Sequence, residues 1–214
     1  MNFLLIDKPA GLTSHDVVDR VRRATGVRRV GHGGTLDPFA TGLLIVGVGR
    51  EATRELSSFL GCDKEYEATM ILGAVSDTQD RDGKIETVAE AQLPSLEQLV
   101  TVLKSFLGRH DQIPPMYSAK KIGGKKLYEL ARAGQVVERQ PVEITIHDIE
   151  LLTYDPPRAT FRVRCSAGTY VRTIAHDVGQ KLDCGAYLDE LRRTKIGDLK
   201  VTDAISLDNL PKTN

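Results

Sequence analysis

The spacing of apolar and polar positions divides the chain into short strands and amphipathic helices. The apolar run Leu43–Val48 predicts a buried strand, and the alternation over Lys64–Leu72 predicts a half-buried strand with Tyr66 on its apolar face. Further strands are expected at Phe3–Ile6, Val142–Leu152, Ala159–Cys165 and Leu199–Ile205. Because these strands do not follow a regular βαβ repeat, the pattern favours an α+β fold with a mixed, mostly antiparallel sheet.

Capping signals mark the helices. Thr13 with Asp16, and Ser95 with Gln98, match the capping box that opens a helix. The expected helices run from Thr13 to Gly26, over Glu51–Leu60, from Ser95 to Gly108, near Leu127–Ala133 and over Tyr170–Leu182. The core-facing positions of the third helix are expected to be Leu96, Leu99, Val100, Leu103 and Leu107. Thr169 is the candidate N-cap of the last helix, and Tyr187–Arg193 is expected to form a turn or short helix.

Composition limits the class of protein. The chain has 214 residues, a length typical of one large domain, and no apolar run approaches the ~18 residues of a membrane helix. No signal peptide is evident, so we expect a cytoplasmic protein. The net charge is zero, but residues 104–139 carry eight basic and three acidic side chains. Since phosphate binding depends on local basic patches, the neutral total does not exclude an RNA ligand.

Three patterns suggest other chemistry, and each is weak. Gly47-Val-Gly-Arg-Glu-Ala52 fits a dinucleotide-binding turn, but the next strand alternates instead of forming a second buried run. The acidic hairpin at 76–83 lacks the ligand spacing of a calcium loop and is expected to be a solvated turn. The five histidines and three cysteines never pair at metal-ligand spacing. We therefore expect no metal and no nucleotide cofactor.

The remaining candidate is the glycine-rich loop at 31–42, which contains Asp37. Two adjacent glycines allow close backbone approach to a ligand, and Pro38 favours an extended conformation at Asp37. The loop leads into a buried strand, which is a rigid anchor for a reactive group. The alternative is a turn-rich connection in which Asp37 only caps a helix or turn.

A second candidate is the stretch Ser166–Asp177, in which Arg172 lies in the first turn of the expected helix. Arginine there opposes the helix dipole, so a specific partner is expected. A carboxylate such as that of Asp37 suits this role, because the ion pair keeps the acid ionised and oriented. A surface salt bridge is the equally weighted alternative.

Taken together, five stretches resemble the TruB family of tRNA pseudouridine synthases, in family order and over essentially the whole chain. They are Asp7–Ser14, Gly31–Leu44, Lys64–Tyr66, Ile113–Ala119 and Gly168–Ile174. The resemblance implies the pseudouridine synthase fold, with the central sheet flanked by helices and loops around an active-site cleft. It also implies one catalytic domain over residues 1–214. Bacterial members usually continue into a C-terminal PUA-type RNA-binding domain, which we do not expect here.

The resemblance also implies roles for individual residues. Asp37 is the catalytic residue, as nucleophile or direct participant, and Arg172 pairs with it. Tyr66 stacks on the flipped-out base, and Tyr170 lines the pocket with Arg172. His32 occupies space in the opened RNA loop, Lys8 lies beside the active site and Leu191 packs beneath the uracil. The RNA backbone is expected to contact Arg22, Arg23, Arg28, Arg29, Lys120, Lys121, Lys125 and Lys126.

The implied reaction is the isomerisation of uridine to pseudouridine at position 55 in the T-loop of tRNA. It breaks the N1–C1′ bond and rejoins the base through C5, without redox change, cofactor or metal. Attack at C1′, addition to the base and a glycal route all stay open. The expected partner is the T-arm stem-loop of tRNA, bound by a monomer. The main rival is a different class, an RNA-binding or tRNA-folding module without chemistry.

Overall fold

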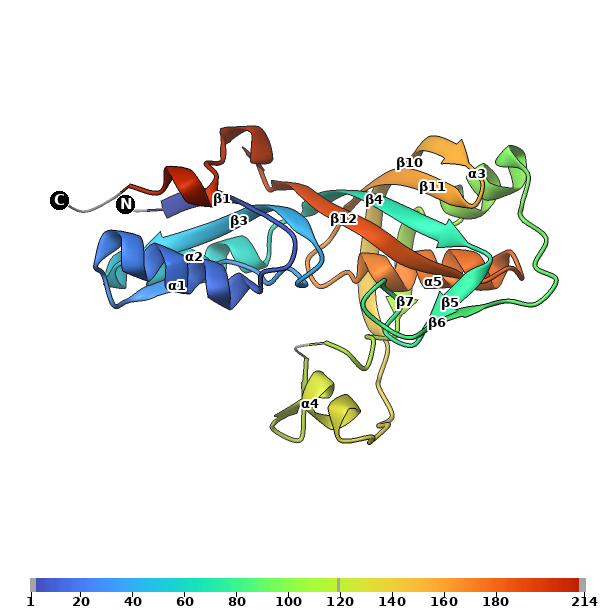
Figure 1. Ribbon diagram of the computed structural model, residues 1–214, viewed down its shortest axis with the longest axis horizontal. Coiled ribbons are helices and arrows are strands. Elements are labelled where there is room, and N and C mark those ends of the chain that lie inside the picture. Colours follow the sequence, from blue (N-terminus) through green and yellow to red (C-terminus); the bar gives the residue numbers. More distant parts are fainter. Residues whose placement is uncertain (1–2, 119, 212–214) are drawn as a thin grey trace. The chain divides into compact units, whose positions relative to one another are not determined.

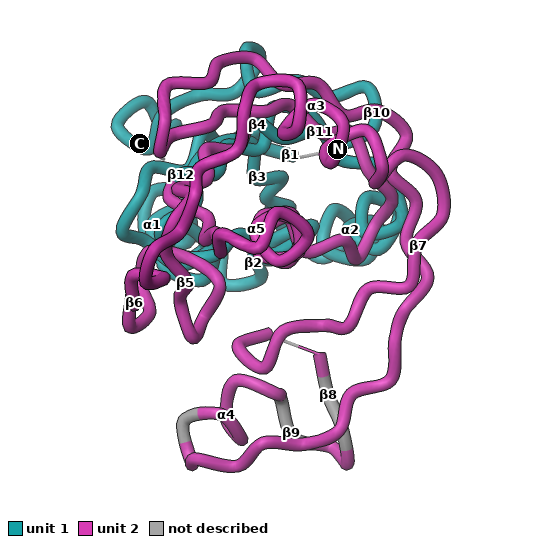
Figure 2. Tube along the Cα trace, turned by 90° about the vertical axis from the view of Figure 1, so that its right-hand side faces the viewer, with its two compact units in different colours: residues 1–67, 190–214 teal, residues 68–189 magenta. Residues whose placement is uncertain are grey.

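The structure is a computed structural model that describes residues 3–118 and 120–211 (Figure 1). It is α+β with a mixed, mostly antiparallel sheet, as the sequence predicts. Two compact units are formed by Met1–Glu67 with Glu190–Asn214, and by Ala68–Asp189 (Figure 2). We call them unit 1 and unit 2.

The elements are grouped by type, each group in chain order. The strands of the main sheet are β1 (Phe3–Lys8), β2 (Val30–His32), β3 (Thr41–Val48), β4 (Lys64–Leu72), β7 (Gly108–Gln112), β10 (Val142–Asp155), β11 (Arg158–Cys165), β12 (Ala186–Ile196) and β13 (Leu199–Lys200). The short strands outside it are β5 (Ala74–Ser76), β6 (Ile85–Thr87), β8 (Lys121–Ile122) and β9 (Lys125–Lys126). The helices are α1 (Ser14–Thr25), α2 (Arg50–Leu60), α3 (Leu96–Lys104), α4 (Leu127–Arg132) and α5 (Val171–Lys181), with 3₁₀ turns at Val201–Asp203 and Leu207–Asn209.

In unit 1, β3 is the central strand. It pairs antiparallel with β1 and β2, and parallel with β12. Leu44 and Val46 pack with α1, whereas Leu43 and Ile45 pack with Leu56 of α2. Successive strand residues point to opposite faces, so the two helices cover the two faces of β3. This double burial explains why the run from Leu43 is continuously apolar.

The predicted capping boxes are confirmed in both places. The Thr13 side chain accepts from the Asp16 backbone, the Asp16 carboxylate accepts from Thr13, and Gly26 ends α1 in the left-handed conformation. Ser95 and Gln98 cap α3 in the same way. Local sequence signals alone therefore set the start of these helices.

In unit 2, strands β4, β11, β10 and β7 are successive neighbours, and β10 pairs antiparallel with both β11 and β7. The apolar face predicted for β4 is buried, with Ala68, Met70 and Leu72 all at most 2% exposed. Helix α3 contributes Leu99 and Leu103 to the core, but Leu96 and Leu107 are 58% and 46% exposed. The prediction for these two leucines was wrong, because α3 ends at Lys104 and its first residue points outward.

Three other expectations need correction. Residues 187–193 belong to strand β12 and not to a helix or turn, and Arg192 and Arg193 pair with β3. The N-cap of α5 is Tyr170, and Thr169 instead donates to the Ser166 carbonyl. The last expected strand is only β13 and a 3₁₀ turn, with Ile205 making an isolated bridge to Ile6.

The glycines of the dinucleotide-like pattern have structural explanations. A Cβ on Gly47 would lie 3.0 Å from the Ala52 backbone, so glycine lets α2 approach β3 closely. Gly49 has a φ of 91°, which favours glycine, at the start of α2. Within the described residues, no group of three or more metal-ligating side chains is found, and no helix is long and apolar enough to cross a membrane.

Candidate active site

The loop between β2 and β3 carries Asp37, and several of its residues are buried within unit 1. Leu36, Phe39 and Ala40 are each at most 4% exposed. The Gly33 amide donates to the Ile45 carbonyl at 2.8 Å, and the Ala40 amide donates to the Asp37 carbonyl at 3.1 Å. The Asp37 side chain itself is half-buried. The carboxylate therefore stands on a loop fixed from both sides.

Lys8 and Ser14 hold this loop through its carbonyl groups. The Lys8 ammonium is buried and donates to the carbonyls of Leu12 at 2.7 Å, Pro9 at 2.9 Å and Pro38 at 3.2 Å. Ser14 Oγ donates to the Leu36 carbonyl and accepts from the Leu36 amide. These contacts fix the residues on either side of Asp37.

Arg193 of β12 is the third side chain that holds the loop, and it is 1% exposed. Its guanidinium donates to the carbonyls of Leu43 at 2.8 Å, Gly34 at 3.1 Å and Thr35 at 3.3 Å. Gly42 lets the strands meet there, because a Cβ would lie 2.3 Å from the Arg193 carbonyl oxygen. Lys8 of β1 and Arg193 of β12 therefore hold the Asp37 loop in the same way, by donating to backbone carbonyls.

Burial and neighbouring charges shift two pKa values in this region. Burial lowers the pKa of Lys8 to about 8; the Asp37 carboxylate opposes that shift and Arg193 adds to it. Burial, Arg193 and His15 lower the pKa of His32. The Nδ1 atom of His32 is buried without a hydrogen-bond partner in the described part of the chain. At neutral pH, Lys8 therefore carries its charge beside Asp37, whereas His32 is a neutral ring.

Tyr66 and Leu191 occupy buried strand positions in unit 1, at 9% and 8% exposure. Thr41 Oγ1 donates to the Leu191 carbonyl at 3.4 Å. The carboxylate of Glu65 accepts from Thr194 and Lys195, both at 2.9 Å, and so fixes the strand next to Tyr66. Stacking of Tyr66 on a base and packing of Leu191 beneath it stay predictions.

In unit 2, Arg172 forms an ion pair with Asp80, and each side chain is 5% exposed. Its guanidinium donates to an Asp80 oxygen at 2.9 Å and to the Tyr117 carbonyl at 2.6 Å. The other Asp80 oxygen accepts from Thr78 Oγ1 and from the Asp82 amide. The hairpin at 76–83 is thus not merely a solvated turn, because Asp80 is buried as the partner of Arg172. Pairing of Arg172 with Asp37, which belongs to unit 1, stays a prediction.

Tyr170 lies next to Arg172 at the start of α5. The Arg172 guanidinium carbon is 5.8 Å from the centre of the Tyr170 ring. The side-chain amide of Gln112 bonds both the backbone N–H and the backbone carbonyl of Tyr170. The two residues predicted to line a pocket are therefore neighbours held by buried contacts.

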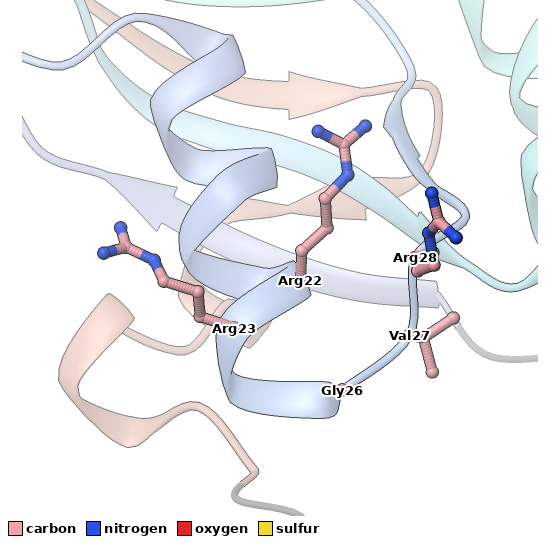
Figure 3. Close-up of a pocket in the computed structure, with 5 residues that line it drawn as sticks. All are labelled: Arg22, Arg23, Gly26, Val27 and Arg28. Carbon is pink, nitrogen blue, oxygen red and sulfur yellow. The ribbon is translucent and has the colours of Figure 1, made fainter.

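The predicted basic residues fall into two groups. Arg22, Arg23 and Arg28 line a shallow pocket of about 370 Å³ at the end of α1, where the Arg23 side chain points away from those of Arg22 and Arg28 (Figure 3). Arg22 also bonds Asp19 and the Val30 carbonyl. Arg29 bonds Thr53. Of the four lysines, the backbones of Lys121, Lys125 and Lys126 belong to β8 and β9, but their side chains lie outside the described part; Lys120 is half-buried.

Reasoning from the sequence missed three residues that hold the candidate site. Arg193 lies in a stretch expected to be a turn or short helix, Asp80 lies in a hairpin rich in polar residues, and Gln112 ends an unpredicted strand. No pattern in the sequence marked β12 as a strand, because Leu188 and Leu191 are three residues apart, a spacing that favours a helix. All three side chains are buried by partners far along the chain.

Two family models match the chain. Residues 22–171 match the TruB family pseudouridylate synthase (N terminal domain), and residues 172–213 match the tRNA pseudouridylate synthase B C-terminal domain. The tRNA pseudouridine synthase B of Syntrophotalea carbinolica is 49% identical over 205 residues, which are 96% of this chain and 67% of that protein. The same enzyme of Protochlamydia amoebophila is 53% identical over 194 residues, which are 91% of this chain and 73% of that protein.

Among solved structures, a Cbf5-Nop10-Gar1 complex contains a chain with a TM-score of 0.75 and 32% identity. The match covers 98% of this chain, which spans about half of that longer chain (53%). An H/ACA RNP bound to a substrate RNA containing 2′-deoxyuridine matches with a TM-score of 0.73 and 28% identity, over 98% of this chain and 52% of that one. The fold, the ordered motifs and both family models agree: this chain belongs to the TruB family of tRNA pseudouridine synthases, isomerases that convert uridine to pseudouridine.

Proposed function

We propose that this chain makes pseudouridine at position 55 in the T-loop of tRNA and that Asp37 acts directly in the reaction. The observation that carries the proposal is the way the Asp37 loop is held. Lys8, Ser14 and Arg193 are all at most 2% exposed and bond the loop carbonyls. A carboxylate on such a support is positioned before the substrate arrives, which is what a group acting at C1′ or at the base requires.

The chemistry needs a carboxylate and a detached base. The N1–C1′ bond of uridine breaks, the base turns, and a C5–C1′ bond forms while the C5 proton moves to solvent and N1 gains a proton. Attack at C1′, addition to the base and a glycal route all employ the same carboxylate. In each route Asp37 is the participating group, and the charged Lys8 beside it favours its ionised form.

The base must leave its stack before it reaches Asp37, at a cost of a few kcal/mol. We assign Tyr66 to stacking on that base, which offsets about 1–3 kcal/mol. Leu191 packs beneath the uracil. His32 fills the space left in the opened RNA loop, and its neutral ring suits stacking.

Tyr170 and Arg172 complete the substrate pocket in this proposal, and Arg172 pairs with Asp37. The ion pair between Arg172 and Asp80 supports this role, because it holds the guanidinium in one direction. The RNA backbone is held by the arginines of α1 and the loop after it, and by the lysines at 120–126. Such contacts displace counterions from the RNA phosphates.

We also propose that the chain acts as a monomer in the cytoplasm and that residues 1–214 work as one catalytic domain on the T-arm stem-loop. Sedimentation of the purified chain tests the first point. A second species at twice the mass that persists on dilution would overturn it.

A modification assay on a minimal T-arm stem-loop tests the proposed function. The purified chain is incubated in single-turnover conditions with this RNA, with full-length unmodified tRNA, and with a stem-loop carrying cytidine at the target position; nucleoside analysis follows. We expect pseudouridine from the first two RNAs and none from the third. Binding of both uridine RNAs without product would favour the rival class, a binding or RNA-folding module.

A further inference from the structure

Gln112, the last residue of β7, makes two hydrogen bonds with a single backbone unit. Its Nε2 donates to the Tyr170 carbonyl at 3.1 Å, and the Tyr170 amide donates to its Oε1 at 2.8 Å. The side chain is 5% exposed. Both bonds require the same orientation of the amide, because a flipped group would face donor with donor and acceptor with acceptor. Gln112 therefore fixes both the position and the direction of the Tyr170 backbone.

This contact lies where α5 lacks a cap of its own. Tyr170 is the N-cap residue, and its side chain makes no capping hydrogen bond. Helices usually begin with Ser, Thr, Asp or Asn, whose side chains order the first turn. Here the first turn is anchored from outside, by a residue 58 positions earlier in the chain.

The same segment also reaches Arg172. Tyr117, five residues after Gln112, accepts from the Arg172 guanidinium through its carbonyl at 2.6 Å. The guanidinium in turn lies 5.8 Å from the centre of the Tyr170 ring. The start of α5 is thus held at two points, the backbone of Tyr170 through Gln112 and the side chain of Arg172 through Tyr117.

We propose that Gln112 is a positioning residue for pseudouridine formation. It sets the backbone at Tyr170 and so directs the Tyr170 ring and the Arg172 guanidinium toward the substrate. The inference rests on the proposed function, in which these two residues line the uracil pocket. Because Gln112 is buried, it acts through them and does not contact RNA.

The expected effect is on the chemical step. A displacement of about 1 Å in a positioned group can cost about 10²-fold in rate. We expect Gln112→Met, which keeps the size of the side chain but removes both hydrogen bonds, to slow single-turnover pseudouridine formation by about 10–10²-fold. The affinity for tRNA is expected to stay within about 3-fold of wild type, since uniform binding is not altered.

The experiment compares three single variants on full-length unmodified tRNA. Gln112→Met removes both bonds, and Gln112→Glu keeps the acceptor for the Tyr170 amide while losing the donor. The matched control is Gln180→Met, an exposed glutamine of α5 that lines the same surface pocket as Gln112. Single-turnover rates and filter-binding affinities are measured at a temperature where circular dichroism shows every variant folded. We expect Gln180→Met to keep the wild-type rate and both Gln112 variants to fall below it, because Gln112→Glu also places an oxygen against the Tyr170 carbonyl.

A double variant distinguishes positioning from general loss of structure. If Gln112 acts through Arg172, Gln112→Met should slow the Arg172→Lys enzyme much less than it slows wild type. An equal fold-loss in both backgrounds, or an unchanged rate for both Gln112 variants, overturns the positioning role while wild-type activity stands. Absence of product from the wild-type chain would refute the proposed function and, with it, this role. If Gln112→Met does not fold, Gln112→Glu carries the same comparison.

Discussion

Replacing Asp80 by asparagine removes the charge that faces Arg172 without changing the size of the side chain. Both side chains of this pair are 5% exposed, so water replaces little of the interaction that the guanidinium loses. Unit charges 4 Å apart interact by about 4 kcal/mol at an effective dielectric constant of about 20. Breaking a buried pair by removing one partner costs about 3–5 kcal/mol. We therefore expect Asp80→Asn to lower the free energy of unfolding by about 3–5 kcal/mol, measured by urea titration.

The matched control is Glu86→Gln, in strand β6 shortly after the hairpin at 76–83. It breaks the ion pair with Lys84, whose two side chains are 77% and 62% exposed. An exposed pair contributes about 0–1 kcal/mol, so this variant should unfold nearly as wild type does. In the double variant Asp80→Leu with Arg172→Met no charge is left buried, and much of the stability should return. If Asp80→Asn costs no more than Glu86→Gln, the description of the pair as a buried, mutually dependent unit is wrong.

Three further predictions concern the Asp37 loop and the RNA contacts. Gly42→Ala should destabilise the protein more than Gly49→Ala in thermal unfolding. Both glycines have positive φ (101° and 91°), where a side chain costs about 1–3 kcal/mol of strain, but only at Gly42 would a Cβ also clash, 2.3 Å from the Arg193 carbonyl oxygen. Equal losses of stability in the two variants would contradict the close packing at Gly42. In Asp37→Asn, the pKa of Lys8 should fall below about 8, because the Asp37 charge raises that pKa; the ¹³Cε chemical shift of Lys8 measures it. The pKa of Lys8 in the folded protein lies below the unfolded value of 10.5, so the stability of the protein rises with pH between these two values. In the variant this rise in stability should begin at lower pH. Changing the four lysines at 120, 121, 125 and 126 to glutamine should weaken tRNA binding and flatten its salt dependence, and an unchanged slope in filter binding would refute their role.

Local signals predicted much of the fold. The capping boxes at Thr13 and Ser95 are side-chain to backbone contacts within four residues, and the structure contains both. The apolar run from Leu43 and the alternation from Lys64 likewise report burial directly, and β3 and β4 lie there. Such features need no information from distant parts of the chain.

The elements that were missed depend on distant partners. Arg193 of β12 is buried at a position where an apolar residue is usual. An arginine is tolerated there because carbonyls 150 or more residues earlier in the chain accept its hydrogen bonds. β7 is polar, and no residue pattern marks it as a strand. Asp80 has the composition of a solvated turn, but a partner 92 residues later buries it. Burial of polar side chains is a tertiary property, which periodicity does not contain.

The candidate site shows the same division. Reasoning from residues alone reached Asp37 and Arg172, and the resemblance to the TruB family added Tyr66 and Tyr170 as candidates. Neither source identified Arg193, which bonds carbonyls of the Asp37 loop, or Gln112, which bonds the Tyr170 backbone. Supporting residues of this kind have no chemistry of their own to recognise, so that only the folded arrangement reveals them.

Asp37 is the residue that we propose carries out the isomerisation of uridine-55. Asp37→Asn and the exposed control Asp208→Asn, from the same unit, are each incubated with unmodified tRNA in single-turnover conditions, and pseudouridine is mapped by nucleotide position. We predict that both variants fold and bind tRNA as wild type does, that Asp208→Asn forms pseudouridine at position 55, and that Asp37→Asn forms none. Turnover by Asp37→Asn near the wild-type rate would contradict the assignment of Asp37 as the reacting group.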